Sequence, residues 1–120
     1  MVAGTASAAA LVRRVAVTGD SMRPALEPGD RVLAVRTRRA RAGDLVVVRD
    51  PRATGRLLVK RVAAVGAHGV EVLGDNAAAS TDSRVFGPVP VVWGRALYRY
   101  APAARAGWLP RGGGPSRGGG

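Results

Sequence analysis

Cysteine is absent from the 120 residues, and histidine occurs once, as His68. Without thiols the chain has no disulfide framework, no thiolate metal site and no cysteine nucleophile. One histidine cannot build a histidine-rich metal site, and the segment Gly66-Ala67-His68-Gly69 is typical of a turn. We therefore expect neither a metal nor a cofactor.

Lysine is almost absent as well. The chain holds 19 lysine and arginine residues, of which only Lys60 is a lysine. Arginine stays protonated, whereas a desolvated lysine can lose its proton and act as a base. Lys60 lies in the apolar run 57–62 and shares one strand face with Leu58 and Val62. Alternation alone does not decide which face is inward, so a lysine extending to solvent from an edge strand is the alternative.

Aromatic residues make up only 4% of a chain whose net charge is +11. The densest basic cluster has no interleaved aromatics, so it offers no stacking platform for nucleic acid. We interpret it as a solvated basic face, and we expect no nucleic-acid partner. A non-catalytic basic binding module nevertheless remains an alternative function. The cluster consists of Arg36, Arg38, Arg39 and Arg41.

Long apolar runs are also lacking, since no stretch reaches the roughly 20 residues of a membrane span. The segment 3–12 is short, and its charges Arg13 and Arg14 follow the apolar part, the reverse of a secretory signal. We therefore expect a cytoplasmic protein without a transmembrane span. Peripheral contact with the cell membrane is the alternative.

Short β-branched runs separated by turn residues predict a mainly β fold, a compact barrel or sandwich in a single domain. Residues 21–26 are the only expected helical turn. The predicted strands span residues 12–17, 31–36, 44–49, 57–65, 70–73 and 91–100. Residues 1–10 are expected to be a flexible N-terminus, and residues 105–120 a disordered tail rich in Gly, Pro and Arg.

Two polar segments stand out from this background. In Gly19-Asp20-Ser21-Met22-Arg23-Pro24 a serine lies between a strand end and a proline-terminated turn, where its hydroxyl is exposed and nearby N–H groups can hold an oxyanion. Alone, this serine would be better explained as a helix N-cap than as a nucleophile. The loop 74–84 carries Asp, Asn, Ser and Arg side chains close together, which by themselves indicate an ordered turn.

Together with the lysine strand, these segments resemble the type I signal peptidase family of serine–lysine proteases. Order and spacing agree from about residue 15 to residue 100, so residues 11–104 are expected to form a signal-peptidase-like catalytic domain. The resemblance implies that Ser21 is the nucleophile, that Lys60 is its general base and that Ser80 orients the lysine amine. It implies oxyanion or orienting roles for Gly19 and Asp20. It also implies structural support of the site by Arg61, Gly74, Asp75, Asn76, Asp82 and Arg84.

The compact chain and its segment 92–102 most resemble the nickel-type superoxide dismutase maturation proteases. This subgroup implies a precursor protein partner from which an N-terminal extension is removed. Two departures from the family are Gly19, where some members carry a hydroxyl residue, and Ala77, where an arginine is usual. Signal-peptidase-like processing of secretory precursors and a LexA-like self-cleaving domain are the alternatives.

Overall fold

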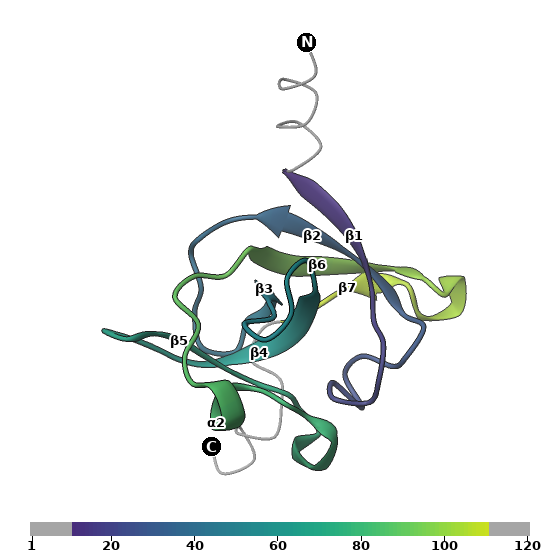
Figure 1. The fold of residues 1–120 in the computed structure, drawn as a ribbon. Helices are drawn as coiled ribbons and strands as arrows, with labels where there is room; N and C mark the ends of the chain where they lie inside the picture. The colour runs from purple at the N-terminus through teal and green to yellow at the C-terminus, as the bar shows by residue number, and fades with distance from the viewer. Residues whose placement is uncertain (1–10, 111–120) are drawn as a thin grey trace.

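Seven strands dominate the computed structural model, which describes residues 11–110 (Figure 1). The strands are β1 (Val12–Ala16), β2 (Arg31–Arg36), β3 (Leu45–Arg49), β4 (Leu57–Gly66), β5 (Gly69–Leu73), β6 (Gly94–Ala101) and β7 (Gly107–Trp108). The mainly β, single-domain prediction is confirmed. The expected flexible N-terminus 1–10 and residues 111–120 lie outside the described residues.

All seven strands belong to one antiparallel sheet in the order β1-β2-β6-β3-β4-β5, with β7 added to β6. In Figure 1, β2 and β6 cross the upper part of the molecule and β4 and β5 the lower part, with β3 between them. The strand β6 therefore joins the N-terminal hairpin to the β3–β4–β5 meander.

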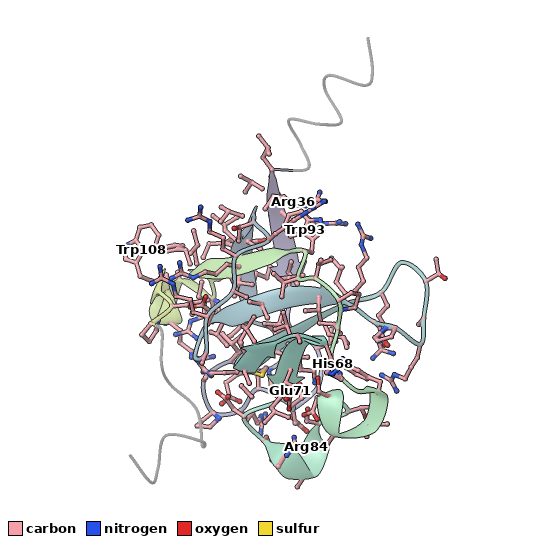
Figure 2. The ribbon with its side chains drawn as sticks, turned by 90° about the vertical axis from the view of Figure 1, so that its left-hand side faces the viewer. Arg36, His68, Glu71, Arg84, Trp93 and Trp108 are labelled. Carbon is pink, nitrogen blue, oxygen red and sulfur yellow. The ribbon has the colours of Figure 1, made fainter. Side chains whose placement is uncertain are left out.

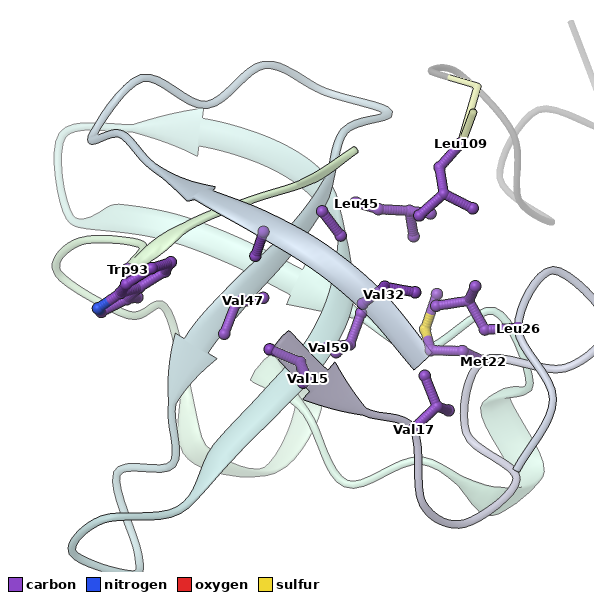
Figure 3. Packing of buried hydrophobic residues seen from close by; sticks show 12 residues of the cluster. Val15, Val17, Met22, Leu26, Val32, Leu45, Val47, Val59, Trp93 and Leu109 are labelled. Atoms are coloured by element: carbon purple, nitrogen blue, oxygen red, sulfur yellow. The ribbon is translucent and has the colours of Figure 1, made fainter. Parts of the chain in front are cut away.

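Two apolar cores lie on opposite faces of the central strand β3. Successive side chains of a strand point to opposite faces, and β3 follows this rule with apolar residues on both sides. Leu45 and Val47 belong to one core, and Val46 and Val48 to the other. Figure 3 shows the first core, with Met22 at one end and Trp93 at the other. The loop that follows β1 is therefore attached to the larger of the two cores.

The sequence pattern missed the two-residue strand β7 and three short helical segments. The helical segments are η1 (Ala77–Ala79), α2 (Ser83–Phe86) and η2 (Ala103–Arg105). The segment 21–26 forms turns held by a Leu26 N–H bond to the Met22 carbonyl. The last long strand begins at Gly94 rather than at residue 91.

The predicted tail boundary at residue 105 is too early. The Arg105 guanidinium bonds the buried Asp30 carboxylate at 2.6 Å, and Leu109 is buried in the first core. The Trp108 ring meets Tyr98 edge-on at 5.0 Å. Arg, Trp and Leu side chains thus anchor a segment whose glycine- and proline-rich composition indicated disorder.

Gly94 is required where β6 lies directly against the backbone of β2. A Cβ atom at this position would lie 2.2 Å from the backbone oxygen of Val35. We expect Gly94→Ala to lower the free energy of unfolding by about 1–3 kcal/mol, because the two backbones must move apart. Urea denaturation followed by circular dichroism measures this loss.

The matched control is Gly66→Ala, because a Cβ at Gly66 meets no atom within 4 Å. This control should change stability by no more than about 0.5 kcal/mol. Equal midpoints for the two variants would contradict the close-approach argument.

Candidate active site

A cavity of about 180 Å³ lies between the loop that follows β1 and the first half of β4. Both Ser21 and Lys60 line it, together with Gly19 and Asp20. Ser21 and Lys60 are 39 positions apart in the sequence. The fold therefore brings together the two segments that the sequence singled out.

Ser21 is held at the cavity by the residue that follows it. Met22 and Leu26 are buried in the first core, and burying a side chain of this size contributes roughly 1.5–3 kcal/mol. Gly19 adopts φ +72°, a left-handed conformation that glycine tolerates best, and so turns the chain before Ser21. Neither the Ser21 hydroxyl nor its N–H is hydrogen-bonded to the described residues. Both groups are thus free to meet a ligand.

The hydrogen bonds and ion pairs of Asp20 within the described residues are made to residues other than Lys60. The Asp20 carboxylate forms an ion pair with Arg23 at 3.1 Å, and both side chains are about half exposed. Its backbone carbonyl accepts a hydrogen bond from the Asn76 side chain. Asp20 therefore helps to fix the serine loop through its backbone.

Lys60 is buried, with 3% of its surface exposed. Val59 and Arg61 on the other face of β4 are buried as well, which is why alternation could not identify the inward face. A lysine extending to solvent is therefore wrong. The Lys60 amine donates a hydrogen bond of 3.0 Å to the Ser80 hydroxyl.

A buried carboxylate sets the direction of this hydrogen bond. Asp82 accepts from the Ser80 hydroxyl at 2.6 Å, from the Gly74 N–H at 2.8 Å, and from the Arg84 guanidinium and N–H. Because an ionised carboxylate only accepts, the Ser80 proton points to Asp82. The Ser80 oxygen then accepts from Lys60, so the lone pair of a neutral Lys60 is left for another donor.

The pKa of Lys60 is lowered from its ordinary value of 10.5, mainly because burial disfavours the charged amine. The Asp82 carboxylate opposes this shift, and the guanidinium groups of Arg52 and Arg84 add to it. Burial also works against the charge of Asp82, but hydrogen bonds from Arg84, Ser80 and Gly74 hold its pKa far below the usual value. The site therefore combines an ionised acid with an amine that loses its proton more easily than an exposed lysine does.

The loop after β5 is fitted against the serine loop. A Cβ atom at Gly74 would lie 2.3 Å from the Ser80 hydroxyl oxygen and 2.7 Å from the Ser21 carbonyl oxygen. The Asn76 N–H donates to that Ser21 carbonyl at 2.8 Å. Glycine and asparagine thus allow the two loops to approach each other directly.

Arg61 and Asp75 form a buried ion pair that fastens the end of β5 to β4. Two guanidinium nitrogens bond the two carboxylate oxygens at 3.0 and 2.7 Å, and a third bonds the Gly43 carbonyl at 3.1 Å. Breaking a buried pair by removing one partner costs about 3–5 kcal/mol. Arg61 thus supports the site from the face of β4 opposite to Lys60.

Sequence reasoning missed three cavity residues, Arg52, Arg56 and Thr81. The two arginines belong to the β3–β4 loop, whose Pro and Gly indicated only a turn. The basic cluster that the sequence did single out lies elsewhere, since Figure 2 shows Arg36 beside Trp93 at the opposite end of the molecule from Arg84. His68 lies in the exposed β4–β5 turn, as expected.

Comparison with known proteins decides the family. The family model described as "Signal peptidase, peptidase S26" matches residues 1–72. The chain belongs to the signal peptidase family. It is also similar to the mitochondrial ATP-independent inner membrane protease subunit 1a of Arabidopsis thaliana, with 39% identity in an alignment 115 positions long; the alignment covers 72% of this chain and 68% of that protein.

Members of the signal peptidase family are serine peptidases, and this membership supports processing of precursor proteins. Within residues 11–110, no helix is long and apolar enough to cross a membrane. The same part of the chain contains no group of three or more His, Cys, Asp or Glu residues arranged to hold a metal ion.

Acid titration tests the Asp82 network. The folded pKa of Asp82 is depressed, so its stabilising contribution is complete above the unfolded pKa of about 3.9 and is lost as the pH falls toward the folded value. At neutral pH, Asp82→Asn should lower the free energy of unfolding by at least about 1.5 kcal/mol, the contribution of one hydrogen bond to a charged group. This difference should shrink below pH 4. Urea titrations between pH 2 and pH 7 measure it, and a difference independent of pH would contradict the network.

Proposed function

We propose that the protein is a serine endopeptidase in which Ser21 is the nucleophile and Lys60 the general base. One observation carries this proposal: a buried lysine with a lowered pKa shares a cavity with a serine whose hydroxyl is uncommitted. The two side chains are not hydrogen-bonded to each other in the free protein. Catalytic hydrogen bonds are often long before substrate binds.

The reaction follows from the proton arrangement. The neutral Lys60 amine accepts the Ser21 proton as the serine oxygen attacks the scissile carbonyl, and the resulting ammonium protonates the leaving amine. An ester between Ser21 and the N-terminal part of the substrate remains. Water, deprotonated by the same amine, then hydrolyses this ester. Ser80 keeps the amine in place during both halves of the reaction.

The Ser21 N–H is the first donor that we propose for the oxyanion. It has no acceptor among the described residues, and it lies beside the attacking oxygen on the same residue. Thr18 also lines the cavity and supplies a hydroxyl close to Gly19, where some relatives carry one. We propose Thr18 as the second donor.

An extended substrate has an open strand edge to pair with. Residues 57–60 of β4 pair with β3 on one side, whereas β5 joins the other side only from Arg61 onward. The cavity lies along this open part of β4. A substrate strand added here would use backbone hydrogen bonds for affinity and would bring its scissile bond to Lys60 and Ser21.

For the substrate we propose the precursor of a nickel-type superoxide dismutase, from which the enzyme removes the N-terminal extension in the cytoplasm. Support comes from the likeness of the chain to that subgroup in its compactness and its segment 92–102. Processing of secretory precursors at the membrane is the second candidate. The similarity to a protein named as an inner membrane protease subunit favours it.

Co-expression with each precursor separates the two candidates. We expect the nickel superoxide dismutase precursor to be shortened at one position by the wild type and left intact by Ser21→Ala, because alanine has no hydroxyl oxygen with which to attack. Mass spectrometry of the product N-terminus measures the cut. If only a secretory precursor is processed, the subgroup proposal is wrong and the peptidase proposal stands.

Replacement of the lysine tests the base. Lys60→Arg should lower kcat by at least about 100-fold, because arginine cannot accept the serine proton and general-base catalysis contributes roughly 10²–10⁴-fold. In the wild type, kcat/KM should rise with pH as Lys60 deprotonates, with a midpoint below 10.5 because its pKa is lowered. Circular dichroism controls for folding of the variant. Near-normal activity of Lys60→Arg would remove Lys60 from the mechanism.

A further inference from the structure

The β3–β4 loop brings two guanidinium groups to the cavity that holds Ser21 and Lys60. Arg52 and Arg56 both line it. The loop places one carboxylate, that of Asp50, with these two cations, so one positive charge is not neutralised within the loop. Asp20, an acid that lines the cavity, is already paired with Arg23.

Arg52 is committed to the fold. Its guanidinium bonds both Asp50 oxygens at 3.1 Å, its N–H bonds the same carboxylate at 2.9 Å, and its charge lies 5.9 Å from the Phe86 ring centre. The Asp50 side chain is fully buried. Burial alone would raise the pKa of Asp50, but the hydrogen bonds from Arg52 keep it below its usual value. The Asp50–Arg52 pair therefore fixes the conformation of the loop.

Arg56 is the more loosely held of the two cations, because its ion pair with Asp50 is long. Its Nε lies 3.7 Å from Asp50 Oδ2, which is beyond hydrogen-bond distance, and its side chain is 62% exposed. Its guanidinium donates no hydrogen bond to the described residues, so its five N–H groups are free. A guanidinium pairs best with a carboxylate, which accepts two of these hydrogen bonds at once.

The register of β4 gives the spacing between Arg56 and Lys60. The Asp50 N–H bonds the Arg56 carbonyl at 2.8 Å, which continues the β3–β4 ladder by one residue before Leu57. Arg56, Leu58 and Lys60 therefore share one face of the extended chain. Four residues of strand span about 13 Å. A substrate extended beside this edge has the same spacing, so Arg56 reaches a side chain about four residues from the scissile bond.

We propose that Arg56 selects an acidic side chain, Asp or Glu, three to five residues from the bond that is cut. The inference rests on the proposed peptidase function, because the distance of three to five residues is counted from a bond cut at Ser21 and Lys60. Arg56 acts here as a specificity residue, and the Arg52–Asp50 pair holds its loop in position.

A mixture-based library of short unstructured peptides tests this preference. Full-length wild type, Arg56→Gln, Arg56→Glu and the control Arg38→Gln are each incubated with the library, and cut positions are read by mass spectrometry. Arg38 is a suitable control because it lines a separate hollow with Arg36 and Trp93. We expect the wild type to cut peptides with Asp or Glu at one such position roughly 5- to 10-fold faster than peptides with the matching amide.

The variants decide between selection and general charge effects. Arg56→Gln should lose the acidic preference, Arg56→Glu should favour Lys or Arg at the same position, and Arg38→Gln should keep the wild-type preference. The wild-type preference should weaken as salt is raised, because the pair is partly exposed. An unchanged profile in the Arg56 variants, or cleavage by wild type without any acidic preference, overturns the proposal while the peptidase function stands.

If the wild type cuts no more of the library than Ser21→Ala does, the peptidase function fails, and binding then decides about Arg56. Fluorescence anisotropy with Ser21→Ala compares labelled peptides that carry Glu or Gln. If Ser21→Ala binds the Glu peptides more tightly than the Gln peptides, and the double variant Ser21→Ala/Arg56→Gln binds both equally, the result supports a carboxylate site at Arg56. Equal binding overturns it.

Discussion

The buried Asp82 carboxylate accepts hydrogen bonds from three residues, and the geometry of the site depends on it. It accepts hydrogen bonds from Gly74 before η1, from Ser80 after η1 and from Arg84 in α2. A segment rich in small and polar residues has little apolar surface with which to pack. Hydrogen bonds to the charged Asp82 carboxylate stabilise the loop in place of apolar packing, and each of them holds one more residue of the loop.

Fixing this loop also fixes the two other segments of the site. From this loop, the Ser80 hydroxyl accepts a hydrogen bond from the Lys60 amine on β4, and the Asn76 N–H donates one to the Ser21 carbonyl. Gly74 has no side chain, so the Ser80 hydroxyl and the Ser21 carbonyl can both lie next to its backbone. The serine loop is held from the other side by Met22 in the first core. Hydrophobic burial therefore sets the place of the serine, and a polar network sets the place of the lysine.

Much of this arrangement was predictable from the sequence, and the exceptions have physical reasons. The strand 31–36 was predicted with its observed bounds because the turn residues 28–30 precede it directly and residues 32–35 are all apolar. The pairing of Ser80 with Lys60 was implied by the family resemblance alone. The inward face of β4 was not predictable, because both faces carry apolar residues and the sheet is covered on both sides. The cavity arginines of the β3–β4 loop gave no signal, since an exposed arginine in a turn is ordinary.

The basic partners of the buried carboxylates explain why a lysine, rather than an arginine, occupies position 60. Asp30, Asp75 and Asp82 each bond an arginine directly, and arginine suits this role because it keeps its charge. Lys60 instead meets its acid through an intervening hydroxyl. Direct contact with a carboxylate would stabilise the ammonium form and raise the pKa of the amine. By placing Ser80 between them, the fold uses Asp82 to position Lys60 while burial still lowers the pKa. An arginine at this position would satisfy the same hydroxyl, but it would have no lone pair to offer to Ser21.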